Sequence, residues 1–185
     1  SVETIVSMAY ENVNNLMNAE SFGIGMYNDK TKSLQFHGFI ERAQKMDFFD
    51  FFLNEKDRFA VWCFEREQEM LMNDVENDYK TYIKDLGKPI AGDAPKSVIY
   101  MPLFSKEKKI GVITVQSFTK NAFSEYQLNI LRNIANSVAI AVDNAALYEN
   151  LEEKVKERKP HEKICPSGTV RGLNETWTRI TTNES

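Results

Sequence analysis

Apolar residues recur every three or four positions near both ends of the patterned part of the chain. Residues 2–18 carry such a stripe, which predicts an amphipathic helix. A second stripe follows Ser124 and Gln127, whose spacing is that of a capping box at a helix start. We therefore expect one helix near each end, the second much longer than the first.

Two pairs of strands are predicted between these helices. The first pair spans residues 21–28 and 33–40, and the second spans residues 97–104 and 110–118. Each pair contains β-branched or aromatic residues and is interrupted by a short polar run, which is typical of a hairpin. The pattern therefore predicts two hairpins.

The strand at residues 33–40 is expected to have two different faces, because successive side chains of a strand point to opposite sides. The apolar face consists of Leu34, Phe36 and Ile40, and the mixed face of Gln35, His37 and Phe39. No second metal ligand accompanies His37 in the sequence, so a metal site is not expected here.

The insert between the two hairpins is irregular. The aromatic run at residues 48–53 suits either a helical turn or an irregular cover packed on the sheet. Residues 58–67 and 75–83 are predicted to form short helices with a short strand at 69–73 between them. Glycines and prolines between residues 87 and 95 then mark a loop. This α+β order requires an antiparallel sheet with one face buried under helices.

The C-terminal helix is expected to continue beyond the domain. Its periodicity narrows to a heptad seam made of Ala141, Asn144, Tyr148, Leu151, Val155 and Arg158. We therefore predict a domain at residues 1–150 and a coiled-coil-like linker helix at 151–158. Residues 159–185 have no sustained period and are rich in polar residues, so a flexible or irregular tail is expected.

The composition of the chain excludes some classes of binding partner. The chain has 185 residues and a net charge of −4, which gives no basic footprint for nucleic acid or an anionic membrane. No apolar run reaches the roughly 18 residues that span a bilayer. We expect a cytoplasmic segment without direct membrane contact. Cys63 and Cys165 stand far apart, which excludes a disulfide framework and a zinc site but leaves a single disulfide open. No cofactor or metal motif is present in the sequence.

Three segments of the second half carry a more specific pattern: SVIYMPLF, KKIGVITVQSF and the helix that starts at FSEYQL. They resemble the C-terminal half of a GAF domain, in which a strand ending in Pro-Leu pairs with the next strand and a long helix follows. The matching positions are Pro102, Leu103, Gly111, Phe123, Leu128, Leu131, Ala135, Ala139, Ala141, Asn144, Ala145 and Leu147. With a looser match in the first half, the resemblance covers residues 2–150.

The resemblance implies a fold and a pocket. The fold is α+β, with a central antiparallel sheet of five to six strands, the amino- and carboxy-terminal helices on one face and the helical and loop insert on the other. The pocket lies between the sheet and the insert. Its candidate ligand-binding residues are Trp62, Asn73, Asp74 and Tyr79 from the insert, and Tyr100, Thr114 and Gln116 from the second hairpin. Trp62 and Tyr100 also suit a core, and Asp74 also suits a helix cap.

Specialised branches of the family need residues that this sequence lacks. Methionine sulfoxide reductases of this fold use closely placed cysteines, and bilin-binding members use a cysteine followed by histidine, whereas Phe64 follows Cys63. Of the signature of the cyclic-nucleotide branch, only Phe123 and Glu125 have counterparts. We therefore predict no catalytic residue.

Three functional hypotheses follow. The first is a non-catalytic small-molecule sensor in a bacterial signalling protein, which relays a signal through its terminal helices to an output domain such as the histidine kinase of a two-component system, a cyclase or a phosphatase. The alternative is a structural dimerisation module whose pocket is filled by its own aromatic side chains. Residues 2–18 and 141–158 are expected to form a homodimer interface. The third hypothesis, an enzyme, would require a reactive Cys63.

Overall fold

The computed structural model of the protein describes residues 1–89 and 93–158. The chain divides into two compact units, Ser1–Asn150 and a second unit that starts at Leu151. The tail predicted for residues 159–185 lies outside the described residues. Among the described helices, none is both long and apolar enough to cross a bilayer.

The long helix predicted near the end of the chain is α4, Glu125–Arg158. Its capping box is confirmed. The Ser124 N–H donates to Gln127 Oε1 over 2.8 Å, and the Tyr126 N–H donates to Ser124 Oγ over 3.2 Å. The two side chains thus pair backbone N–H groups that a helix start would otherwise leave without partners.

Eight strands form one antiparallel sheet within the described residues, more than the five to six expected. They are β1 Ser21–Asn28, β2 Ser33–Phe36, β3 Ile40–Glu41, β4 Gln44–Lys45, β5 Phe49–Phe52, β6 Met70–Met72, β7 Ser97–Ser105 and β8 Lys108–Ser117. The main order is β4-β3-β1-β8-β7-β6, and β2 pairs with both β1 and β5. The two predicted hairpins therefore lie side by side, because β1 pairs with β8.

The prediction of a single strand at residues 33–40 is wrong. β2 ends at Phe36, and the chain turns at Gly38, whose φ of +91° lies in a region that favours glycine. The turn breaks the alternation: Phe39 joins the core on the insert side together with Phe36, whereas Ile40 joins the core on the helix side. A backbone turn therefore decides the faces of Phe39 and Ile40.

The aromatic run at residues 48–53 is also corrected. It forms strand β5 rather than a helical turn or an irregular cover, and β5 pairs with β2 through Leu34 opposite Phe51 and Phe36 opposite Phe49. The helix predicted at residues 58–67 is confirmed as α2, Phe59–Arg66. The helix expected at 75–83 is divided into α3, Val75–Asp78, and a 3-10 turn at Tyr79–Thr81.

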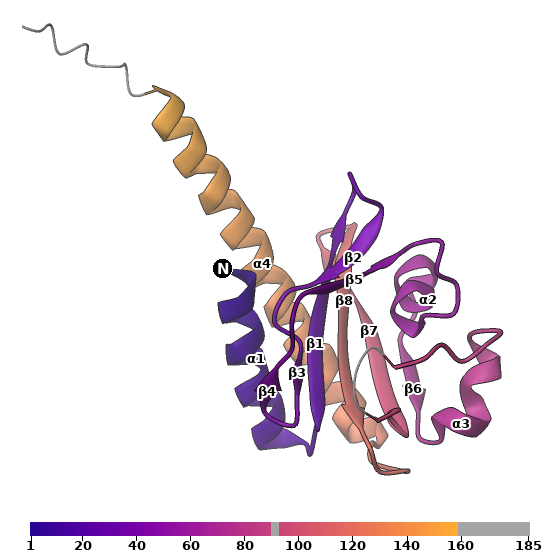
Figure 1. Ribbon diagram of the computed structural model, residues 1–185. Coiled ribbons are helices and arrows are strands. Elements are labelled where there is room, and N and C mark those ends of the chain that lie inside the picture. The colour runs from indigo at the N-terminus through magenta and orange to yellow at the C-terminus, as the bar shows by residue number, and fades with distance from the viewer. Residues whose placement is uncertain (90–92, 159–185) are drawn as a thin grey trace, which may run out of the picture. The chain divides into compact units, whose positions relative to one another are not determined.

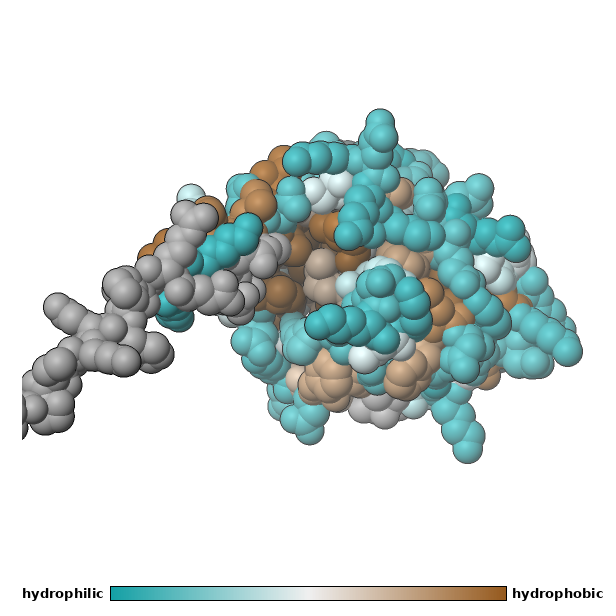
Figure 2. All heavy atoms as spheres, turned by 90° about the horizontal axis from the view of Figure 1, so that it is seen from above, coloured by the Kyte–Doolittle hydropathy of each residue, from teal (hydrophilic) through white to brown (hydrophobic). Residues whose placement is uncertain are grey.

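The first unit has three layers (Figure 1). Helices α1, Val2–Leu16, and α4 cover one face of the sheet, and the insert with α2 and α3 covers the other. A separate hydrophobic core lies on each face. From above, this unit has a largely hydrophilic rim with hydrophobic residues toward its middle (Figure 2). The α+β fold, with terminal helices on one face and the insert on the other, is thus confirmed.

Candidate functional site

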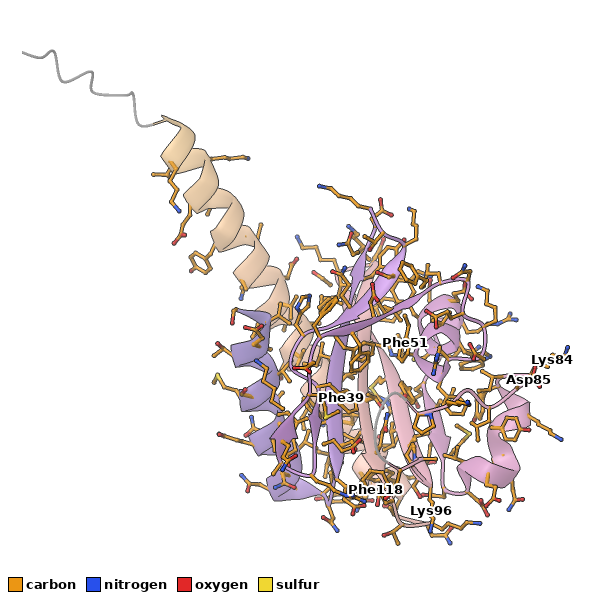
Figure 3. The ribbon with its side chains drawn as sticks, in the orientation of Figure 1. Phe39, Phe51, Lys84, Asp85, Lys96 and Phe118 are labelled. Atoms are coloured by element: carbon orange, nitrogen blue, oxygen red, sulfur yellow. The ribbon has the colours of Figure 1, made fainter. Side chains whose placement is uncertain are left out.

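A cavity of about 130 Å³ lies between the sheet and the insert. Its apolar walls are mostly aromatic, and the phenylalanines among the described lining residues are Phe36, Phe39, Phe49, Phe51 and Phe59. Phe39 and Phe51 lie on the same side of the sheet, one below the other in Figure 3. A concave site with aromatic walls and a few polar groups is typical of small-molecule binding.

Two glycines in β1 allow the walls to lie close to the sheet. A Cβ atom at Gly23 would stand 2.3 Å from the Phe39 ring, and one at Gly25 would stand 2.5 Å from the Phe36 ring. Both separations are far below van der Waals contact, so any side chain at either position would displace a ring that lines the cavity. The glycines of the segment SFGIGMYN therefore shape the site.

The phenylalanine rings form one contiguous cluster. The Phe36 and Phe49 rings are stacked with their centroids 4.9 Å apart, and the Phe36 and Phe51 rings meet edge to face at 5.7 Å. Phe39 meets Phe49 edge to face at 5.5 Å. Because these geometries are the ones aromatic pairs prefer, each ring fixes the position of its neighbours.

The polar side of the cavity is built by β7 and β8. Tyr100 and Thr114 are paired across the two strands, and the Gln116 side chain donates from Nε2 to the Tyr100 hydroxyl over 2.9 Å. Burial raises the pKa of Tyr100 to about 12, so this hydroxyl stays protonated at neutral pH. Thr114 is 1% exposed. Its Oγ1 lies close to Tyr100 and lowers the pKa of that hydroxyl, yet it has no hydrogen-bond partner within the described residues.

Charged residues of both signs stand around the walls. The Arg58 guanidinium lies over the Phe51 ring at 4.8 Å, and its Nη1 donates to the Lys88 carbonyl over 3.0 Å. The Arg58 Nε lies 3.4 Å from Glu55 Oε2. Arg42 and Asp93 form an exposed pair at 2.9 Å. Arg58, the arginine on the cavity wall, is therefore already paired with Glu55 and with the Lys88 carbonyl.

Of the seven candidate ligand-binding residues, the structure brings three together at the cavity: Tyr100, Thr114 and Gln116. The other four lie outside its described lining, where the structure shows their surroundings. Trp62 meets the Tyr82 ring edge to face at 4.9 Å. Asp74 Oδ2 accepts hydrogen bonds from Asn77 and Lys120, each over 2.8 Å. Tyr79 begins the 3-10 turn.

Asp74 stands at the N-cap position of α3, as the capping interpretation expected, but its side chain makes no capping hydrogen bond there. Hydrogen bonds from Lys120 and Asn77 hold the pKa of this carboxyl below its ordinary value. Since the paired side chain is directed at Lys120, it tethers the segment before α4 to the start of α3.

Sequence reasoning missed the aromatic walls and the arginine of the site. The dense phenylalanine spacing at residues 48–53 was the available signal, because Phe49 and Phe51 alternate as strand residues do. Read as a strand, this run would have placed both rings on one face of the sheet. Arg58 gave no comparable signal, since its place beside Phe51 depends on the path of the chain between β5 and α2.

The fourth candidate, Asn73, bridges the end of β6 to the segment before α4. Its Nδ2 donates to the Phe123 carbonyl over 2.7 Å, and its Oδ1 accepts from the Phe123 N–H over 3.1 Å. We expect Asn73→Ala to lower the free energy of unfolding by about 2 kcal/mol, because two part-buried hydrogen bonds are lost. Urea denaturation measures this change. The exposed Asn133→Ala serves as the matched control, with an expected change within about 0.5 kcal/mol; equal midpoints for both variants would contradict a stabilising bridge.

Cys63 is fully buried in the core on the insert side. Burial is the main reason that the pKa of its thiol is raised, with a smaller contribution from the charge of Glu69. Since the thiolate is the nucleophile, this thiol is poorly placed for catalysis.

We therefore expect iodoacetamide to label Cys63 at pH 8 at least about a hundredfold more slowly in folded protein than in urea, because an unfolded thiol has a pKa near 8.5. A Cys165→Ser background leaves Cys63 as the single thiol, and mass spectrometry follows the labelling. Similar rates in the two states would restore the enzyme hypothesis.

These features define a class of protein domain: an antiparallel sheet with terminal helices on one face and a pocket-forming insert on the other. Residues 1–143 match the GAF domain family, and the chain belongs to that family. Its members are mostly regulatory and occur in sensor and signalling proteins.

Several known proteins are similar to this chain. The chain is 31% identical over 117 residues to the formate hydrogenlyase transcriptional activator of Escherichia coli (strain K12), a match that covers 63% of this chain and 17% of that protein. A methyl-accepting chemotaxis protein has a similar fold, with a TM-score of 0.65, 19% identity, and coverage of 80% of this chain and 92% of that one. The type II free methionine-R-sulfoxide reductase of Thermoplasma acidophilum has a TM-score of 0.59, 19% identity, and coverage of 77% and 94%. The two solved structures, each 19% identical to this chain, support the fold alone.

Proposed function

We propose that this domain is a non-catalytic sensor that binds a small molecule between its sheet and its insert. The observation that carries the proposal is the cavity itself: aromatic side chains line its walls, and the buried Thr114 hydroxyl on its polar side has no hydrogen-bond partner among the described residues. A buried polar group without a partner costs free energy, and a ligand that supplies the missing hydrogen bond recovers it. Of the seven candidate residues, we propose that Tyr100, Thr114 and Gln116 contact the ligand directly.

The proposed output route runs through α1 and α4. Val13 of α1 and Leu131 of α4 belong to the core on the helix face, together with Ile113 of β8. Thr114, the next residue of β8, lines the cavity on the opposite face. A ligand that shifts β8 therefore acts on both faces through one strand. The shift between helix arrangements is limited by the ligand's differential affinity for them, typically about 1 to 3 kcal/mol.

We also propose a homodimer through the terminal helices. Three of the seam residues are large and exposed: Tyr148 at 70%, Leu151 at 57% and Val155 at 57%. They recur with the alternating three- and four-residue spacing of a coiled coil, and such a stripe is stabilised by a second copy of the same helix. Residues 151–158 act in this proposal as a linker helix after a domain that spans residues 1–150.

We expect Leu151→Glu to convert the dimer to a monomer, because a charge at a seam position is unfavourable in a coiled-coil interface. Light scattering would then give half the mass of the wild type. Lys156→Glu also adds negative charge but lies off the seam, and it should stay dimeric. A Leu151→Glu variant with the mass of an unchanged wild-type dimer would contradict the seam.

Native mass spectrometry of protein purified without added ligand tests the sensor proposal directly. A retained small molecule that is released on denaturation is the expected result. Ala60 lines the cavity and is 1% exposed, so Ala60→Met should fill the cavity and abolish retention. Ser137→Met adds the same side chain at an exposed position of α4 and should leave retention unchanged. Retention by Ala60→Met equal to that of the wild type would place the ligand elsewhere.

The alternative function, a dimerisation module with a self-filled pocket, is favoured by the contiguous phenylalanine cluster around Phe36 and Phe49. It predicts that native mass spectrometry finds only the mass of the protein without ligand, and that no ligand stabilises the fold. A sensor, in contrast, gains a free energy of unfolding of about RT ln(1 + [L]/Kd) from its ligand.

We also propose that the domain is cytoplasmic and controls an output domain. The curated relatives are transcriptional activators, so control of transcription joins histidine kinase, cyclase and phosphatase outputs as a proposal.

A further inference from the structure

The size and walls of the cavity limit the shape of its occupant. An apolar cavity of roughly 150 Å³ admits a benzene-sized molecule, and the cavity here measures about 130 Å³. Phe39, Phe49 and Phe51 present ring edges and faces around it. Aromatic walls in these orientations offer offset and edge-to-face contacts to one further ring. A flat, single-ring molecule therefore fits both the volume and the walls.

The polar side of the cavity requires a hydrogen-bonding group on that ring. Thr114 Oγ1 is buried and has no hydrogen-bond partner in the described part of the chain. The neighbouring Tyr100 hydroxyl accepts from Gln116, and its own proton stays available for donation. A hydroxyl can donate or accept, so one hydroxyl on the ligand can pair with both of these groups.

The charges around the cavity favour a neutral occupant. Tyr100, Thr114 and Gln116 carry no charge on the polar side. Arg58 stands on the wall, where Glu55 and the Lys88 carbonyl already hold it. Asp57 Oδ1 lies 4.0 Å from the Arg58 Nε and adds further negative charge. Lys88 also lines the cavity, but neither Lys88 nor Arg58 belongs to β7 or β8. A carboxylate buried against these two strands would therefore lack a cationic partner there among the described residues, and an unpaired buried charge is strongly unfavourable.

We infer that the cavity binds a neutral, phenol-like molecule: one aromatic ring that carries a hydroxyl group directed at Thr114 and Tyr100. This inference rests on the proposed sensor function and adds the chemical class of the ligand. The walls select the ring, and the two strand hydroxyls select the polar substituent.

Three probes of similar size test the class by calorimetry and thermal shift: p-cresol, p-xylene and benzoate. In wild-type protein we expect p-cresol to bind and to raise Tm with concentration, p-xylene to bind at least about tenfold more weakly, and benzoate not to bind. Thr114→Val keeps the shape but removes the hydroxyl, so it should weaken p-cresol about tenfold and leave p-xylene unchanged. Thr119→Val makes the same replacement at an exposed position and should bind p-cresol like the wild type.

Three outcomes would overturn the inference: benzoate binding as tightly as p-cresol, p-cresol binding unaffected by Thr114→Val, or no binding of any probe. Should Thr114→Val fail to fold, Tyr100→Phe supplies the second hydroxyl deletion, and the order of the three probes in wild-type protein decides the class without any variant. A charged ligand that is retained in native mass spectrometry and excluded by Ala60→Met would refute the phenol class and leave the sensor proposal intact. A clean apo mass together with no probe binding would refute both.

Discussion

Replacing Phe22 with alanine is expected to lower the free energy of unfolding by about 4 kcal/mol. Phe22 lies in β1 and is completely buried on the helix face of the sheet, where its ring centroid stands 6.1 Å from that of Tyr10 in α1. Truncation removes a large apolar side chain and leaves a cavity that the sheet and the two terminal helices can only partly close. Since a domain is typically stable by only about 5 to 15 kcal/mol, this is a large share of the total.

Urea denaturation followed by circular dichroism measures the change. Phe48→Ala is the matched control, because Phe48 is 53% exposed and its truncation should cost less than about 1 kcal/mol. Phe22→Leu retains most of the apolar volume and should fall between the two, which keeps the comparison usable if the alanine variant does not fold. Equal losses for Phe22→Ala and Phe48→Ala would contradict the position of Phe22 in the core.

The second large effect is expected at Gly111, where alanine should lower the free energy of unfolding by about 3 kcal/mol. Gly111 lies in β8 opposite Met26 of β1, and a Cβ atom there would stand 2.2 Å from the carbonyl oxygen of Gly25. The obstacle is backbone rather than a movable side chain. The two strands must therefore separate, which weakens the pairing that joins the two hairpins.

Gly87→Ala is the control for this variant. The described atoms nearest to a Cβ atom at Gly87 would be the ends of the Asp57 and Arg58 side chains, which can move aside. Its free energy of unfolding should change by no more than about 0.5 kcal/mol. If Gly111→Ala unfolds at the same urea concentration as Gly87→Ala, the close approach of β8 to β1 is not a constraint on this fold.

The segments with strong local signals were predicted well. Three of these signals are local: the period of apolar residues in α1 and α4, the capping box at Ser124, and the β-branched runs of β7 and β8. The structure contains the element that each of them predicts. The spacing of the motifs in the second half of the chain also indicated the GAF family. Three of the candidate ligand residues reached the cavity for the same reason, since Tyr100, Thr114 and Gln116 lie on neighbouring strands whose faces follow from alternation.

The insert was predicted less well, because its structure depends on contacts between distant segments. β5 exists through its pairing with β2, and each strand alone is only four residues long. The polar character of Asn73 favours a ligand-binding role, yet its side chain hydrogen-bonds to the backbone of Phe123, fifty positions along the chain. Such long-range partners leave no periodic trace near either residue.

The sequence by itself determined the first and last helices of the described fold and the two hairpins, because helix and strand periods and capping residues act over a few positions. The spacing of its motifs indicated the GAF family. Only the tertiary structure decided the cavity. Its walls require the turn at Gly38 to direct Phe39 to the insert side, and they require Gly23 and Gly25 to leave room for two rings. The Thr114 hydroxyl is buried without a hydrogen-bond partner among the described residues, and this is a property of the surrounding fold and not of threonine itself.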